Sequence, residues 1–142
     1  MGFVSLTEVP DNIYIGSATT ANSMFNGCIN LIKAPYINTS TITDMTSMFV
    51  NCTKLKTVPL YNTSSVTNFT STFQGCCDLE SVPLFNTVAA TNMTQMFSMS
   101  VTTYGALTYV PDFNTASVTT FANMFNNCTA LRTAPTFTYT SA

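Results

Sequence analysis

The amino-acid sequence predicts an α/β fold, a right-handed solenoid of about five coils with short parallel strands and short helices. Three observations predict it. Several residue types recur at a fixed interval of about two dozen residues, the first part of each interval has apolar residues at helical spacing, and the second part is a brief apolar run that contains a proline. A fixed period between 20 and 50 residues is typical of a solenoid or another repeat array.

The repeat is visible in four independent columns of residues. A Met-Phe or Thr-Phe pair begins at positions 24, 48, 72, 96 and 124. A leucine follows each pair, at Leu31, Leu55, Leu79, Leu107 and Leu131. A proline comes next, at Pro35, Pro59, Pro83, Pro111 and Pro135, and Asn-Thr pairs begin at Asn38, Asn62, Asn86 and Asn114. Leu6 and Pro10 fit two of these columns one unit earlier, so we expect residues 1–20 to form an N-terminal cap and partial repeat, and residues 21–142 to form the repeats of one domain.

The segment 63–76 illustrates the helix that we expect in each unit. Its apolar residues stand at i, i+3, i+7 and i+10 and would share one helical face: Val66, Phe69, Phe73 and Cys76. Thr63 or Ser64 can cap the start of this helix, and Gly75 stands where a left-handed residue would close it. The same position is occupied by residue types that tolerate that conformation, at Gly27, Asn51 and Asn127.

The segment 55–61 is too short for a second helix and predicts a brief extended strand. Strands that recur once per unit, separated by helices, would be parallel and would lie about 4.8 Å apart. Because proline donates no hydrogen bond to a sheet, we expect this strand to begin or to bend at Pro59.

Composition excludes several classes of function. Charged residues make up 7% of the chain, where roughly a quarter is usual, so the solvated faces must consist of Thr, Ser and Asn. The net charge is -2 and the chain has 4 basic residues, too few to neutralise a row of phosphates, which argues against nucleic acid as a partner. No apolar run is long enough to insert into a membrane, and no signal peptide is visible at the N-terminus. We therefore expect either a piece of a larger protein or a chain that reaches its place by assembly.

The sequence offers no catalytic, cofactor-binding or metal-binding residues, and we expect a protein that is not an enzyme. It has no histidine, which is the commonest general base and metal ligand. The cysteines recur once per unit rather than in closely spaced pairs, so they predict a column of small buried thiols with Cys77 beside it. The carboxylates show no recurrent pairing.

The unit Met45–Leu55 with Pro59 follows the pattern M-x-x-M-F-x-x-C-x-x-L-x-x-x-P, and Asn62–Phe69 follows N-T-S-x-V-T-x-M except for its final Phe. This pattern resembles the leucine-rich-like repeats of bacterial surface proteins, akin to the BspA-like group, and similar arrays occur in phage proteins. The resemblance covers nearly the whole chain after about Ala21. It implies a leucine-rich-repeat-like fold and a role in adhesion or recognition.

Partner binding is expected where the units differ. The second residue after each proline is large and apolar and is expected to point inward, at Ile37, Tyr61, Phe85, Phe113 and Phe137. The first residue after each proline is mixed and is expected to point outward, at Tyr36, Leu60, Leu84, Asp112 and Thr136. The preceding positions add Lys33, Lys56, Glu80, Tyr109 and Arg132 to this candidate face.

Two further places are candidates for partner binding. The fourth interval has a four-residue insertion within 98–106, and such insertions emerge as loops that often bind, which selects Thr102, Thr103 and Tyr104. The last unit would leave an apolar face and unpaired edges at the C-terminal end, so we expect self-association or continuation of the stack there.

These features predict a non-catalytic recognition or adhesion module on a bacterial surface or virion, without a cofactor, that binds a protein or a surface glycan. The alternative is a structural assembly subunit of a phage tail, head fibre or filament that binds copies of itself. The expected location is the extracellular surface or the virion.

Overall fold

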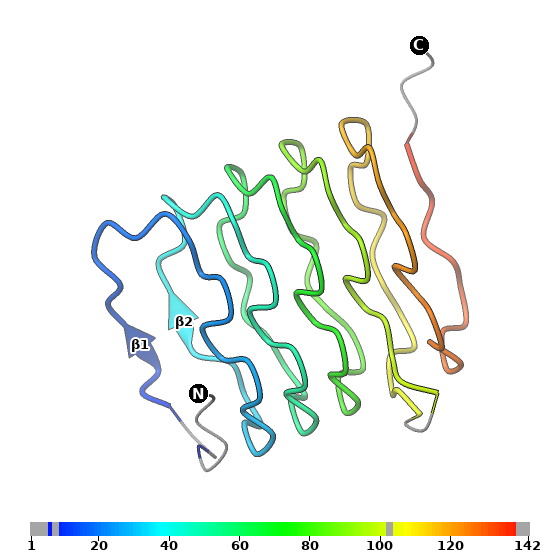
Figure 1. Ribbon diagram of the computed structural model, residues 1–142, viewed down its shortest axis with the longest axis horizontal. Coiled ribbons are helices and arrows are strands. Elements are labelled where there is room, and N and C mark those ends of the chain that lie inside the picture. Colours follow the sequence, from blue (N-terminus) through cyan, green and yellow to red (C-terminus); the bar gives the residue numbers. More distant parts are fainter. Residues whose placement is uncertain (1–5, 7–8, 102–103, 139–142) are drawn as a thin grey trace.

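The computed structural model describes residue 6, residues 9–101 and residues 104–138. Figure 1 shows successive repeat units side by side along the longest axis, from β1 at one end to the last described unit at the other. The regular secondary structure consists of two short strands, β1 (Asn12–Ile13) and β2 (Tyr36–Ile37). They pair in parallel, with Asn12 opposite Tyr36 and Ile13 opposite Ile37.

The predicted fold class is wrong. Among the described residues there is no helix, and the only strands are these two strands of two residues each. The right-handed, leucine-rich-repeat-like α/β solenoid of about five coils is therefore replaced by units built from turns. Elsewhere the neighbouring units are joined by isolated parallel bridges, such as those from Asp44 to Asn68 and from Asn68 to Asn92.

The hydrogen bonds of the segment 63–76 explain why no helix forms there. In an α-helix each amide donates to the carbonyl four residues earlier. Here the amides of Phe69, Ser71 and Phe73 donate instead to carbonyls of the next unit, each at 2.9 Å. The amides of Thr72 and Gln74 donate to the carbonyl three residues earlier, at 3.2 and 3.1 Å. The segment is thus a run of turns in which every second amide points toward the neighbouring unit.

Left-handed residues close these turns. The prediction of this conformation is confirmed at four positions, since φ is 73° at Gly75, 76° at Gly27, and 58° at both Asn51 and Asn127. A second column, four residues earlier, was not predicted: Ser23, Ser47, Ser71, Gln95 and Asn123 have φ between 54° and 57°. For a residue other than glycine this left-handed conformation costs about 1–2 kcal/mol of conformational free energy. The hydrogen bonds between units must therefore offset that cost.

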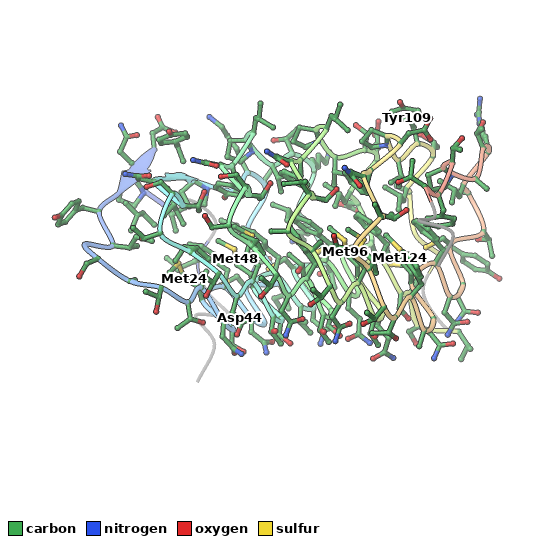
Figure 2. All side chains as sticks on the ribbon, turned by 90° about the horizontal axis from the view of Figure 1, so that it is seen from above. Met24, Asp44, Met48, Met96, Tyr109 and Met124 are labelled. Atoms are coloured by element: carbon green, nitrogen blue, oxygen red, sulfur yellow. The ribbon has the colours of Figure 1, made fainter. Side chains whose placement is uncertain are left out.

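The core is a set of side-chain columns that run through all the units. Neighbouring rings of one phenylalanine column are nearly parallel, with centroids 5.2 to 5.7 Å apart: Phe25, Phe49, Phe73, Phe97 and Phe125. The leucines at positions 31, 55, 79 and 107 are buried beside this column. Figure 2 shows labelled methionines along the long axis, between Asp44 on one edge and Tyr109 on the opposite edge. Each unit therefore packs its apolar residues on both neighbours.

A threonine column connects the units through its side chains. The hydroxyl groups of Thr39, Thr63 and Thr87 are buried, and each donates to a backbone carbonyl of the next unit at 2.8 Å. The expectation that Thr63 caps a helix is therefore wrong. Among the described residues no buried side-chain nitrogen or oxygen lacks a hydrogen-bond partner, so these charge-poor units satisfy their buried polar side chains.

Candidate recognition surface

The residues after the prolines alternate as expected. Ile37, Tyr61, Phe85 and Phe113 are buried. Tyr36, Leu60 and Leu84, which precede three of them, expose 54%, 62% and 62% of their surface. Asp112 and Thr136 continue the outward column and are exposed. Three consecutive units thus present a large apolar side chain to solvent at the same position. Single exposed apolar residues are normal on a protein surface, but a row of them is typical of an interaction site.

The backbone beneath Leu60 and Leu84 lacks regular pairing, whereas the Tyr36 amide in β2 donates to the Asp11 carbonyl at 3.0 Å. The amides of Leu60 and Leu84 have no hydrogen-bond acceptor within the described part of the chain. The preceding prolines, Pro59 and Pro83, have no amide hydrogen to donate. Pairing between units stops at Thr57 and Ser81, which bridge to Lys33 and Tyr109. Two of the three exposed apolar residues in this column therefore have backbone amides without an acceptor in the described part of the chain.

A hollow of about 310 Å³ lies on the apolar column. Its walls come from three units: Tyr36, Leu60, Tyr61, Asn62, Thr63, Leu84 and Asn86. Asn62 and Asn86 each accept a hydrogen bond at Oδ1 from the backbone amide two residues later, at 3.2 Å. The same turn holds both side chains, and both asparagines line the hollow.

The charged residues of the candidate face divide between two neighbouring columns. Lys33 bridges to Thr57, and Tyr109 bridges to Ser81, which places Lys33 and Tyr109 in one column. Lys56, Glu80 and Arg132 lie in the adjacent column: the Lys56 amide donates to Ile32, the Thr108 amide to Glu80 and the Arg132 amide to Thr108. All five predicted residues are exposed. Lys33, Lys56 and Arg132 are positive and only Glu80 is negative, so these positions carry a net positive charge.

A second hollow, of about 510 Å³, lies beside the N-terminal end of this face between Pro10, Pro35 and their neighbours. It contains the one ion pair of the described residues, in which Lys33 Nζ lies 3.4 Å from Asp11 Oδ1. Both side chains are largely exposed, so the pair contributes little to stability.

The insertion leaves the repeat after Met99 and rejoins it at Ala106, whose amide donates to the Cys77 carbonyl at 2.7 Å. Tyr104 exposes 85% of its surface, and Thr102 and Thr103 lie outside the described residues. Gly105 is buried against Met99, and a Cβ added there would lie 3.0 Å from the methionine Cγ. The insertion is therefore anchored at its end, and Tyr104 projects from it.

Cys28, Cys52 and Cys76 are buried as predicted, Cys77 and Cys128 are half-buried, and none of the five forms a disulfide. The thiols of Cys52, Cys76 and Cys128 each donate to a carbonyl of the preceding unit, at 3.0 to 3.1 Å. Burial raises the pKa of Cys52 to about 12 and that of Cys128 to about 11, and it also raises the pKa of Cys76. Such thiols are poor nucleophiles at neutral pH.

The described residues contain no group of three or more histidine, cysteine, aspartate or glutamate side chains that could hold a metal ion. They also contain no helix that could cross a membrane.

Sequence reasoning missed the two asparagines of the hollow. The Asn-Thr pairs mark the repeat in the sequence. Asn62 and Asn86 line the hollow because each side chain forms a turn with the backbone amide two residues later, and the interval between repeats does not indicate that turn. The available signal was the recurring Asn-Thr pair itself, as in Asn62-Thr63-Ser64, because an asparagine side chain often accepts a hydrogen bond from the backbone amide two residues later and forms a turn.

The repeated turns, the stacked side-chain columns and the exposed apolar residues on one face define a repeat protein. The family described as "Mycoplasma protein of unknown function, DUF285" matches residues 19–137, and the chain belongs to this family. A search of curated proteins found no match, and a search of solved structures found none.

Proposed function

We propose that this chain is a non-catalytic recognition or adhesion module whose binding surface is the apolar column of Tyr36, Leu60 and Leu84. The observation that carries the proposal is the hollow on that column, where apolar side chains, unpaired backbone amides and two fixed asparagine side chains come together. Recognition sites commonly combine an apolar surface with a few oriented polar groups.

The chemistry of the hollow suggests its partner. No charged residue lines it, so a partner gains nothing from a net charge. Leu60 and Leu84 offer apolar contact, and the side-chain NH2 groups of Asn62 and Asn86 offer hydrogen-bond donors, since Oδ1 of each already accepts from the backbone amide two residues later. An extended uncharged segment, either a peptide of a surface protein or a neutral glycan chain, fits this combination.

The setting of the module remains part of the proposal. The BspA-like resemblance of the repeat supports a bacterial surface, and the occurrence of similar arrays in phage proteins supports a virion. Tyr104, Lys56, Glu80, Tyr109, Asp112 and Arg132 would then surround the hollow or extend the contact area.

The double variant Leu60→Ser/Leu84→Ser tests the assignment of the surface. Labelled protein is applied to arrays of purified neutral polysaccharides and of extended peptides, and the affinity of each bound probe is measured. We expect the double variant to lose about tenfold or more, because each truncation removes about 1–2 kcal/mol of apolar contact. The melting temperature should change little, because both side chains are exposed.

Val101→Ser is the matched control, since Val101 is also apolar and is 84% exposed but lies on the insertion. It should bind as the unaltered protein does. Equal affinities of the double variant and the unaltered protein would refute this surface, and loss with Val101→Ser alone would move the site to the insertion.

A further inference from the structure

The units diverge toward the apolar column. The ring centroids of one pair of neighbouring units are 5.7 Å apart at Phe73 and Phe97, but 6.3 Å apart at Phe85 and Phe113. The latter two residues directly follow outward positions of the column, Leu84 and Asp112. A parallel ladder would hold neighbouring strands about 4.7–4.9 Å apart, so the wider interval agrees with the missing backbone bonds on this face.

The Tyr61 hydroxyl replaces a backbone bond at one of these junctions. Between β1 and β2 the Tyr36 amide donates to the Asp11 carbonyl at 3.0 Å. The equivalent carbonyl at the next junction is that of Pro35, and it accepts from the buried Tyr61 hydroxyl at 2.7 Å. The Leu60 amide therefore has no ladder partner, and the ladder spacing is not imposed here.

One asparagine in each of four units has an oriented side chain beside this face. In all four, Oδ1 accepts from the backbone amide two residues later, at 3.0 to 3.2 Å: Asn38, Asn62, Asn86 and Asn114. This bond identifies Oδ1 as the acceptor, so the other group is NH2, with two hydrogens to donate. In the described part of the chain no acceptor contacts these NH2 groups.

The first three of these asparagines accompany the apolar column. Asn38, Asn62 and Asn86 each stand two residues after an exposed apolar residue of the column, and the residue between is buried. In an extended segment two such positions share one side. Each of three consecutive units therefore presents an apolar side chain and an NH2 donor together.

We propose that this surface binds an extended, uncharged peptide that runs across the units. The inference rests on the proposed recognition function and specifies the partner of the same surface. An extended peptide advances about 6.4–6.8 Å every two residues, close to the 6.3 Å interval on this face. The backbone carbonyls on one edge of the peptide recur every two residues as well, so successive carbonyls accept from the NH2 groups of Asn38, Asn62 and Asn86.

The same period places alternate side chains of the peptide on the apolar column. Every second side chain of an extended chain points to one face, so apolar residues at alternate positions contact Tyr36, Leu60 and Leu84. No charged residue lines the hollow, so a charged side chain that faced it would lose its hydration without gaining a partner. Main-chain hydrogen bonds combined with contacts to alternate side chains are a common mode of peptide recognition.

Aspartate at the asparagine positions tests the donors without changing the turn. Asp44 already forms this turn, since its Oδ1 accepts from the amide two residues later at 2.9 Å. Asn62→Asp/Asn86→Asp therefore keeps both turns, removes the NH2 groups and turns carboxylates toward the carbonyls of the peptide. Asn92→Asp is the matched control, because Asn92 forms the same turn at 2.9 Å but lies in the column of Asp44.

The probe is a blocked peptide of about seven residues in which threonine and leucine alternate, long enough to cross three units. Its affinity is measured by fluorescence anisotropy with an uncharged dye. We expect the unaltered chain and Asn92→Asp to bind it equally, and Asn62→Asp/Asn86→Asp to bind it at least about tenfold more weakly. A peptide of the same composition with its leucines adjacent should bind several-fold more weakly, because it lacks the two-residue period.

Three results would overturn the inference: no binding of the alternating peptide, equal binding by the aspartate variant and the unaltered chain, or equal affinities for the two peptides. Binding of a soluble neutral glucose oligosaccharide in place of the peptide would overturn it too. The aspartate variant should then still bind the sugar, because a hydroxyl can donate to a carboxylate whereas a peptide carbonyl cannot.

The variant Leu60→Ser/Leu84→Ser separates this inference from the proposed function on which it rests. If that variant binds the peptide or the oligosaccharide as tightly as the unaltered chain does, the recognition surface itself is wrong. If it loses binding while Asn62→Asp/Asn86→Asp does not, the surface is retained and the extended peptide, with its carbonyls on the asparagines, is refuted.

Discussion

The thiol of Cys76 donates a hydrogen bond to the carbonyl oxygen of Phe49 in the preceding unit, at 3.1 Å. The Cys52 thiol makes the same bond to Phe25. Each cysteine thus serves as a small apolar side chain that also satisfies a carbonyl between two units. The column therefore stabilises the array in its reduced form and has no need of a disulfide.

Thiol reactivity should follow this arrangement. Cys77 is half-buried and lies outside the column, so it should react first with an aromatic disulfide reagent under native conditions. Cys52 and Cys76 are buried and should react only when the protein unfolds. Mass spectrometry of the labelled peptides at successive times gives the order, and the variant Cys77→Ser provides the control by removing the fast phase. Fast labelling of Cys76 in the native protein would contradict the buried column.

Stability should fall at alkaline pH. Burial raises the pKa of Cys52 from 9.0 to about 12 and also raises the pKa of Cys76 and Tyr61. Above pH 9.0 the unfolded chain loses thiol protons that the folded chain retains, so the free energy of unfolding decreases as pH rises from there toward about 12. Thermal melts across this range measure the decrease. Cys52→Ala should lessen it, and a melting temperature independent of pH there would contradict the assignment.

Gly75→Ala should destabilise the protein more than Gly27→Ala. Both residues have φ above 70°, so each alanine costs about 1–2 kcal/mol of backbone conformation. A Cβ at Gly75 would also contact Oδ1 of Asn51, whereas nothing lies within 4 Å of a Cβ at Gly27. Urea unfolding of the two variants isolates the effect of the contact. Equal losses would show that Asn51 moves aside freely.

The sequence contained part of this structure and part of the candidate site. Alternation after Pro59 correctly placed Leu60 outside and Tyr61 inside, because side-chain alternation holds in any extended segment. The helix at 63–76 was wrong because turns that repeat every four residues also bring Phe69 and Phe73 to one side. Apolar spacing records which side chains are buried, but it does not record whether the Phe73 amide donates within its segment or to Met96. The shape of the hollow beside Leu60 also depends on which carbonyls the backbone amides bond to, so only the apolar residues of the hollow could be predicted.

Ser47→Gly should stabilise the protein, although it removes a side chain. Ser47 has φ of 56°, a conformation that costs a serine about 1–2 kcal/mol and glycine almost nothing. Glycine's greater freedom in the unfolded chain offsets about 0.5–1 kcal/mol, so we expect a net gain of up to about 1 kcal/mol. Ser65→Gly is the control, since Ser65 is exposed and its φ is not positive, and it should destabilise. The Ser47 amide donates to the Thr70 carbonyl of the next unit at 2.9 Å, and glycine can keep this backbone bond. A loss of stability in Ser47→Gly would therefore mean that the serine side chain, rather than the bond between units, holds this turn in its left-handed conformation.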